Sequence, residues 1–297
     1  MDDNEVRAFF PTLSDLAPIG DPAGQKVVYG CRLADGRRCV LKLVQLPAPL
    51  DEDSEAEYNE AVARMRREIE ILSSIHSPHV TRVADPSEGL QLCEIASQQC
   101  AYYFENLVDG PSVAALLAGG TSLTAEDVAR LGVHVALAIN EFWARGTVHR
   151  DVKPANIMRE DATRTYVLLD AGYALDLTGP SLTRVAGIAG TLPYFSPERL
   201  DLGQKRQLDF RSDLYSLGIV MYEALSGRHP YITHGMGQDA QLQAVAHVAS
   251  VKPAVVATGS EQLWKVVLRL LEKQPHARYR SCQLVVDELS PLQEGEP

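Results

Sequence analysis

The sequence predicts an α+β fold in which strands come first and helices dominate later. Residues 26–45 alternate and turn like a β-hairpin, whereas residues 55–75 and 124–143 carry apolar side chains at helical spacing. The chain has 297 residues, which suits two small lobes or one large domain. Its composition, 45% hydrophobic and 23% charged, is typical of a soluble globular protein.

The first predicted element is the hairpin. Residues 26–33 and 38–44 read as strands, and the Asp35-Gly36 pair between them is a strong turn signal. Lys42 comes near the end of the second, largely apolar strand. A lone lysine in such a place usually protects an exposed strand from aggregation, so its role depends on what else the chain supplies.

A long helix is predicted next, over residues 55–75, and it carries two candidate partners for that lysine. Glu68 and Glu70 lie about 200° apart around it, at roughly 100° per residue, so only one can face a neighbouring strand. The apolar positions that predict the helix recur every three or four residues: Ala61, Met65, Ile69 and Leu72.

Helices are expected to dominate the rest of the chain. Residues 101–105 read as a short strand, and residues 106–110 as the connection that follows it. Thr124 then precedes a long apolar helix that runs to Trp143, and Asp127 three residues later makes the start close to a capping box.

The most informative stretch is HRDVKPAN, residues 149–156, which is followed by Asp170-Ala171-Gly172 and later by Ser196-Pro197-Glu198. Its ordered charges suit phosphoryl transfer. Asp151 can orient a substrate hydroxyl and accept its proton, and Lys153 can neutralise charge on the moving phosphoryl group. Asn156 and Asp170 can hold Mg²⁺ against nucleotide phosphates.

This stretch resembles the HRDxKPxN catalytic loop of eukaryotic-like serine/threonine protein kinases, the Hanks type found in bacteria. Lys153 argues against tyrosine kinases, and Arg150 argues against the HGDxHxxN loop of aminoglycoside-type kinases. The resemblance implies a bilobal protein kinase fold. An N-lobe of antiparallel sheet plus helix C would span residues 1–105, a hinge and mainly helical C-lobe residues 106–290, and a frayed tail residues 291–297.

In the N-lobe, the resemblance makes Lys42 the lysine that binds the α- and β-phosphates of ATP. Glu68, within Arg66-Arg67-Glu68-Ile69, is assigned the ion pair with it, and Glu70 is the alternative. Together with Asp151 and Lys153, Lys42 and Glu68 form the predicted catalytic set.

The nucleotide loop departs from the family pattern. Only Gly20 matches in register, Gly24 is displaced by one place, and Pro22 lacks an N–H. We therefore expect a less complete phosphate cover, with compensating charge from Lys26. At the hinge we favour Phe104 as the gatekeeper. The predicted nucleotide contacts are Gly20, Gly24, Lys26, Val27, Val40, Lys42, Phe104, Glu105 and Leu107.

In the C-lobe, Ala171 stands where the family usually has Phe, which removes more than about 100 Å² of buried aromatic surface but leaves the metal ligand Asp170. Thr191 belongs to a G-T-x-x-Y substrate lip and would bond Asp151 and Lys153. The candidate phosphosites are Ser181 and Thr183, with Thr178 weaker. The resemblance gives structural roles to His149, Arg150, Gly172, Asp213 and the ion-paired Glu198 and Arg278.

The composition limits the kinds of partner that the protein is expected to have. The formal net charge of −11 disfavours nucleic acid. No stretch reaches the roughly 18 apolar residues of a membrane span, and the acidic start does not resemble a signal peptide. The five cysteines, odd in number and without zinc-site spacing, indicate reduced thiols in a cytoplasmic protein. A protein substrate is expected, and a homodimer stays open.

The leading hypothesis is a Ser/Thr protein kinase that transfers the γ-phosphoryl group of ATP to protein hydroxyls with Mg²⁺ and autophosphorylates. One alternative is a pseudokinase that acts as a nucleotide-binding interaction module, which the degenerate glycine loop favours. Another is an enzyme of the same fold that modifies a small molecule, against which the lip at Thr191 and the sequence Ser196-Pro197-Glu198 argue.

Overall fold

A computed structural model describes the following residues of the chain: 2–20, 26–84, 89–119, 123–172, 174–176, 192–200, 208–233, 235–248 and 261–293. The chain divides into two compact units. Unit 1 comprises Met1–His76 and Thr81–Val108, and unit 2 comprises Ser77–Val80 and Asp109–Pro297. The sequence placed this boundary at residue 105, whereas the structure places it at Val108 and assigns the short segment Ser77–Val80 to unit 2.

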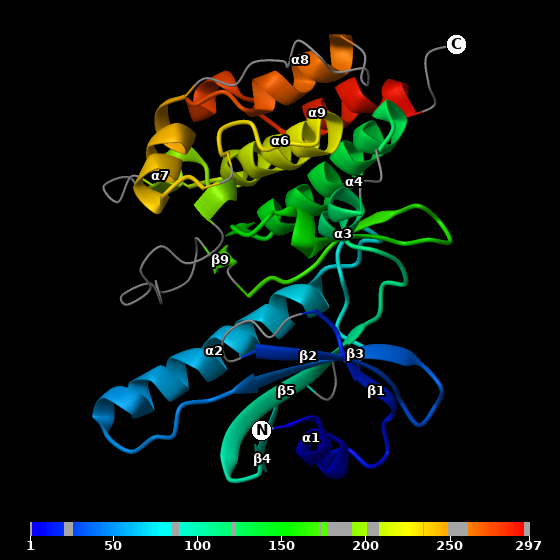
Figure 1. The fold of residues 1–297 in the computed structure, drawn as a ribbon, viewed down its shortest axis with the longest axis vertical. Coiled ribbons are helices and arrows are strands. Elements are labelled where there is room, and N and C mark those ends of the chain that lie inside the picture. Colours follow the sequence, from blue (N-terminus) through cyan, green and yellow to red (C-terminus); the bar gives the residue numbers. More distant parts are fainter. Residues whose placement is uncertain are drawn as a thin grey trace. The chain divides into compact units, whose positions relative to one another are not determined.

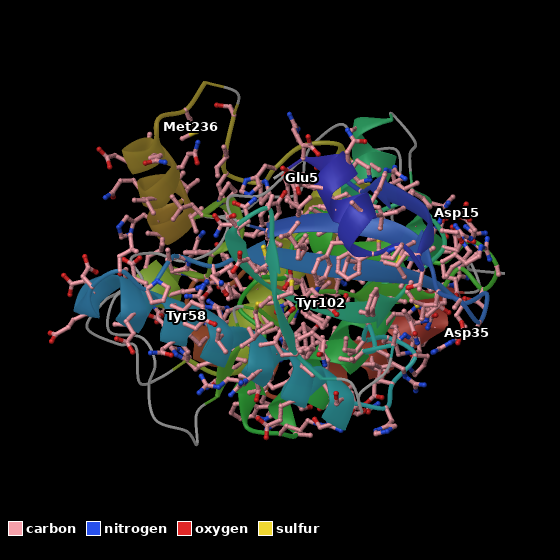
Figure 2. All side chains as sticks on the ribbon, turned by 90° about the horizontal axis from the view of Figure 1, so that it is seen from below. Glu5, Asp15, Asp35, Tyr58, Tyr102 and Met236 are labelled. Atoms are coloured by element: carbon pink, nitrogen blue, oxygen red, sulfur yellow. The ribbon has the colours of Figure 1, made fainter. Side chains whose placement is uncertain are left out.

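Unit 1 contains an antiparallel sheet of five strands in the order β1-β2-β3-β5-β4 (Figure 1). The predicted hairpin is its centre: β2 and β3 pair from Lys26↔Val44 to Arg32↔Arg38. At the outer end of this hairpin Asp15 pairs with Arg32, and Figure 2 labels Asp15 and Asp35 there. The strands are β1 Ser14–Pro18, β2 Lys26–Arg32, β3 Arg38–Gln45, β4 Gln91–Ile95 and β5 Gln98–Asn106.

The two faces of this sheet pack against different helices. Leu41 and Leu43 of β3 join a buried cluster with Val6 and Phe10 from the N-terminal end, where helix α1 (Asp3–Phe9) lies. Lys42, between the two leucines, faces the other way because side chains alternate along a strand. That second face meets helix α2 (Glu52–Ser74).

Helix α2 is the helix predicted over residues 55–75. It begins earlier, at Glu52, because the Asp51 side chain caps it by accepting from the Ser54 N–H at 2.8 Å. Its buried residues include Met65, Ile69 and Leu72, the apolar stripe seen in the sequence.

Unit 2 is mainly helical and is organised around α6 (Phe210–Ser226), most of whose residues are buried. Helix α4 (Ala125–Trp143) starts at the predicted cap, where Thr124 accepts from the Asp127 N–H. Gly132 of α4 permits close packing, since a Cβ there would lie 2.5 Å from Leu289. The other helices are α3 Val113–Ala118, α5 Pro197–Leu200, α7 Gln238–His247, α8 Glu261–Leu270 and α9 Cys282–Leu289.

Short strands in unit 2 carry the segments that hold the predicted chemistry. Two-stranded pairs form between β6 (Thr147–Val148) and β9 (Leu175–Asp176), and between β7 (Ile157–Arg159) and β8 (Tyr166–Leu168). Single 3-10 turns also occur, and their bounds are Pro154–Asn156, Leu192–Tyr194, Pro275–Ala277 and Ser290–Gln293.

The first three residues of the tail that was expected to be frayed are ordered. Residues 291–293 belong to the turn Ser290–Gln293, and Arg130 of α4 donates to the Gln293 carbonyl at 3.4 Å. Residues 294–297 lie outside the described part. Within the structure, the five cysteines form no disulfide. Within the described ranges, the search for a helix with the length and hydropathy of a bilayer span found none.

Candidate active site

Lys42 of unit 1 is buried, with 5% of its surface exposed. It lies opposite Val28 on β2 and opposite Tyr103 on β5. Its Nζ is 3.1 Å from Oε1 of Glu68, which is buried on the sheet-facing side of α2. Glu70 is exposed. Of the two helix glutamates that the sequence left open, Glu68 is therefore the one paired with the lysine.

A second carboxylate contacts the same lysine. Oε1 of Glu105, on β5, lies 2.5 Å from Lys42 Nζ, closer than Glu68 does. The Tyr103 hydroxyl also donates to Glu105 Oε1, at 3.1 Å. Glu105 was expected to contact nucleotide at the hinge, but its pairing with Lys42 was missed. The alternation of β5 against β3 would have revealed it.

Two predicted nucleotide contacts lie on the other face of the sheet. Phe104, expected beside the adenine pocket, packs with Tyr102 against the cluster on the α1 side, at a ring distance of 5.9 Å. Val27 packs against the same cluster. Because strand faces alternate, a shift of one residue moves a side chain to the opposite face, so Val28 and Glu105 share the face of Lys42 instead.

All but one of the other predicted nucleotide contacts lie in the described part of the chain. Lys26 lies two residues from Val28, the strand partner of Lys42, and Val40 lies two residues from Lys42 itself. Their side chains are therefore on the same face of the sheet as Lys42. Gly20 follows β1 with a φ of +70°, a left-handed conformation that favours glycine. Leu107 follows β5 and is half-buried. Gly24 lies outside the described residues.

In unit 2, Asp151 is the centre of the HRDVKPAN segment and is 5% exposed. Lys153 Nζ lies 2.8 Å from Asp151 Oδ2, and Asn156 donates its Nδ2–H to the same oxygen at 2.7 Å. Asn156 also donates to the Asp151 carbonyl at 2.9 Å, so the turn Pro154–Asn156 folds back on the aspartate. Both side-chain bonds end on Oδ2, and Oδ1 receives neither of them.

The backbone before Asp151 is fixed by Asp213 at the start of α6. Asp213 accepts from the N–H groups of His149 and Arg150, both at 2.8 Å. Burial raises the pKa of Asp213 above its ordinary value. Arg150 has a φ of +69°, which is strained for a non-glycine residue and is held by these two bonds.

His149 connects this segment to the one that carries Asp170. Its Nδ1 accepts from the Asp151 N–H at 3.3 Å, so its Nε2 carries the hydrogen that is donated to the Leu169 carbonyl at 3.1 Å. The Leu169 N–H in turn donates to the Asn156 carbonyl at 2.8 Å. The segments that carry Asp151, Asn156 and Asp170 are therefore joined within one unit.

Asp170 follows with a φ of +63°, and its Oδ1 accepts from the Gly172 N–H at 3.1 Å. Ala171 is buried, with 3% of its surface exposed. The position at which the family pattern has Phe is thus enclosed by other groups in this chain.

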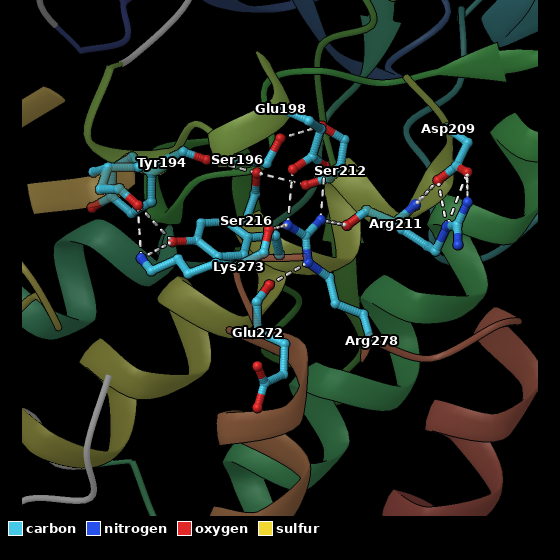
Figure 3. A network of polar contacts seen from close by, with 12 residues as sticks. Tyr194, Ser196, Glu198, Asp209, Arg211, Ser212, Ser216, Glu272, Lys273 and Arg278 are labelled. Carbon is cyan, nitrogen blue, oxygen red and sulfur yellow. Dashed lines mark hydrogen bonds and ion pairs between the residues drawn. The ribbon is translucent and has the colours of Figure 1, made fainter. Parts of the chain in front are cut away.

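The predicted pair of Glu198 and Arg278 is present as a bidentate contact, at 2.7 and 2.8 Å (Figure 3). Arg278 is 2% exposed and also donates to the carbonyls of Arg211, Glu272 and Lys273. One guanidinium thereby ties the Ser-Pro-Glu segment to the start of α6 and to the loop after α8.

The residues next to this pair were not singled out from the sequence. Ser216 donates to the Tyr194 carbonyl at 2.7 Å, and the Tyr194 hydroxyl donates to Glu223 at 2.8 Å. His229 accepts at Nδ1 from the N–H groups of Tyr231 and Ile232, so its Nε2–H donates to the Pro193 carbonyl at 2.9 Å. Burial lowers the pKa of His229 to about 4.

Some predicted residues cannot be placed. Thr191 of the lip and the candidate phosphosites Thr178, Ser181 and Thr183 lie outside the described residues. Arg150, to which the resemblance gives a structural role, is half-buried, and its Nε has no hydrogen-bond partner among the residues that the structure describes. Burial also lowers the pKa of this guanidinium.

Within the described ranges, no group of three or more His, Cys, Asp or Glu side chains could hold a metal ion alone. Asp170 and Asn156 have side-chain oxygens of the kind that suit Mg²⁺, which takes one or two protein ligands and completes its shell with water and phosphate oxygens. Because Asn156 donates its Nδ2–H to Asp151, its amide is oriented with Oδ1 remaining as an acceptor.

The family model described as "Protein kinase domain" matches residues 14–289. A probable serine/threonine-protein kinase of Streptomyces coelicolor is 29% identical over 291 residues, which is 95% of this chain and 40% of that protein. Serine/threonine-protein kinase PknB of Mycobacterium tuberculosis is 32% identical over 239 residues, 79% of this chain and 36% of that protein. The chain thus spans about two fifths or less of the length of these relatives.

Proposed function

The chain belongs to the protein kinase family, and from this premise we propose that it transfers the γ-phosphoryl group of ATP to Ser or Thr hydroxyls of proteins. The observation that carries the proposal is the arrangement of Asp151, whose Oδ2 is occupied by Lys153 and Asn156 while Oδ1 receives neither bond. A carboxylate held in this way can present one oxygen to a hydroxyl.

Asp151 would accept the hydrogen bond of the substrate hydroxyl through Oδ1 and take its proton as the oxygen attacks the γ-phosphorus. Lys153 lies 2.8 Å from the same carboxylate and is 20% exposed, so its ammonium can also neutralise charge on the phosphoryl oxygens. Asp213 supports this geometry by holding the backbone of His149 and Arg150.

Lys42 would bind the α- and β-phosphates, with Glu68 holding its ammonium. Asn156 and Asp170 would hold Mg²⁺, which neutralises charge on the nucleotide phosphates when it is bound. Asp170 has a carboxylate for this purpose, and Asn156 keeps its amide oxygen because its amide nitrogen donates to Asp151.

Autophosphorylation is part of the proposal. Arg150 is a half-buried cation next to Asp151 in the sequence, and its Nε is not hydrogen-bonded to any residue in the described part of the chain. A phosphorylated side chain would supply the acceptor oxygens that a guanidinium binds well. Ser181 and Thr183 remain the proposed acceptors.

The test is intact-mass spectrometry of the protein and of a basic protein substrate after incubation with ATP and Mg²⁺. Wild type should gain phosphoryl groups on Ser or Thr, and Asp151→Asn should gain them at least about 100-fold more slowly because the base is lost. Unchanged melting temperature of the variant is the control for folding. Equal phosphorylation by both proteins would refute the role of Asp151, and none by wild type would favour a nucleotide-binding module without transfer.

A further inference from the structure

Lys42 is held by two carboxylates that come from different elements. Glu68 reaches it from helix α2, and Glu105 reaches it from strand β5 of the same sheet. Glu105 is the nearer, at 2.5 Å against 3.1 Å, and all three side chains are at most 7% exposed. The catalytic roles assigned above use only Glu68, so the second carboxylate is unexplained.

Glu105 is held in place by two contacts. Its Oε1 accepts from the Tyr103 hydroxyl at 3.1 Å in addition to its contact with Lys42 at 2.5 Å. The strand register fixes its position, since Glu105 pairs with Val40 and Tyr103 pairs with Lys42. Glu105 therefore cannot leave Lys42 by a movement of helix α2.

This arrangement works against binding of a phosphate. An ammonium has three N–H donors, and two carboxylates compete for them here. Lys42 contributes one positive charge, whereas Glu68 and Glu105 contribute two negative charges. In a buried setting such charges interact more strongly than in water. A phosphate oxygen that approaches Lys42 meets both competition for donors and an excess of negative charge.

We propose that Glu105 is a determinant of nucleotide affinity: its carboxylate competes with the nucleotide phosphates for Lys42 and weakens the binding of ATP. The inference rests on the proposed function, in which Lys42 binds those phosphates. Glu105 would set the affinity without taking part in phosphoryl transfer, because it acts on the ammonium and not on the reacting atoms.

The experiment is calorimetric titration of wild type, Glu105→Gln and Glu105→Met with MgATP and, separately, with adenosine. Gln keeps the shape and an acceptor oxygen but removes the charge, and Met removes both. We expect Glu105→Gln to lower the Kd for MgATP by about tenfold, a small part of what a nearby unit charge contributes at a partly screened site. Glu105→Met should lower it at least as much, and the Kd for adenosine should not change.

The matched control is Glu94→Gln, which removes one negative charge from the same sheet at an exposed position on β4. It should leave both Kd values unchanged, and melting temperatures establish that each variant is folded.

Unchanged or weaker MgATP binding in folded Glu105→Gln and Glu105→Met would overturn the inference, as would equal tightening of adenosine. In these outcomes wild type still binds MgATP, so the proposed function survives. Absence of MgATP binding by wild type and by both variants would instead refute the proposed function on which the inference rests.

Discussion

The two buried ion clusters of this chain are balanced in opposite ways. In unit 2, Arg278 meets one carboxylate, Glu198, and its remaining donors go to three backbone carbonyls. In unit 1, Lys42 meets two carboxylates, Glu68 and Glu105. In the first cluster one positive charge meets one negative charge, and the donors of Arg278 have acceptors, as a stabilising buried ion pair requires. The second carries surplus negative charge.

This difference distinguishes charged residues that stabilise the fold from charged residues that act in function. A balanced cluster loses stability when any member is removed, because a buried partner is left alone. A cluster with surplus charge can lose one member and gain stability, and in the proposed function the nucleotide phosphates would also contact Lys42. Variants of the two clusters, and of the segments beside them, test this distinction.

The largest effect is expected at the balanced cluster. Arg278→Leu would leave Glu198 buried without its cation and would free three carbonyls, so we expect a loss of about 3–5 kcal/mol in the free energy of unfolding. Urea unfolding followed by circular dichroism measures this. A matched control is Arg37→Leu, whose partner Asp35 is an exposed turn residue at 2.6 Å. A loss below about 1 kcal/mol for Arg278→Leu, as for a surface pair, would refute the structural assignment.

A pH effect is expected next, at the lip beside the balanced cluster. Burial lowers the pKa of His229 from 6.5 to about 4. Between these two pH values, the unfolded chain therefore binds a proton at His229 more readily than the folded chain does. Stability contributed by His229 is therefore present above pH 6.5 and is lost as the pH falls toward 4, by roughly 3 kcal/mol.

The measurement is the free energy of unfolding of wild type minus that of His229→Gln across this pH range. The difference removes the contribution of His134, whose pKa burial also lowers to about 4. A difference that does not change with pH would show that His229 is not held neutral by the fold.

A smaller effect is expected at Ala171, next to Asp170, which we propose as a metal ligand. Since Ala171 is 3% exposed, a phenyl ring there must displace its neighbours, and Ala171→Phe should cost about 1–3 kcal/mol of stability. The Asp170 carboxylate is unchanged, so binding of MgATP should persist in thermal-shift measurements at saturating nucleotide. Loss of MgATP binding by the folded variant would show that Ala171 has more than a packing role.

The sequence predicted much of this arrangement where ordered spacing carries the information. The fold class, the family, the hairpin, helix α2 and the cap at Thr124 all follow from local patterns. Helical geometry predicted that only one of Glu68 and Glu70 could face the sheet, and the resemblance to the family selected Glu68.

Errors arose where a single-residue register decided the outcome. Phe104 and Val27 were predicted to contact the nucleotide, but they pack on the face of the sheet opposite Lys42, because one step along a strand reverses the face. The hydrogen bonds of His229 and the second partner of Lys42 depend on residues far apart in the sequence. Helical periodicity averages over several turns, whereas the face of a short strand depends on knowing its partner, and the partner is a tertiary feature.

The smallest expected effect gives the sharpest test of the comparison. Glu105→Gln keeps an acceptor for Lys42 and for the Tyr103 hydroxyl while it removes the surplus charge, so the free energy of unfolding should stay within about 1 kcal/mol of wild type. Glu198→Gln makes the same chemical change in the balanced cluster and leaves Arg278 buried without a counter-charge, so it should destabilise clearly more. Both are measured by urea unfolding at one pH. Equal losses would mean that Glu105 is as structural as Glu198, and the proposed distinction between the two clusters would fail.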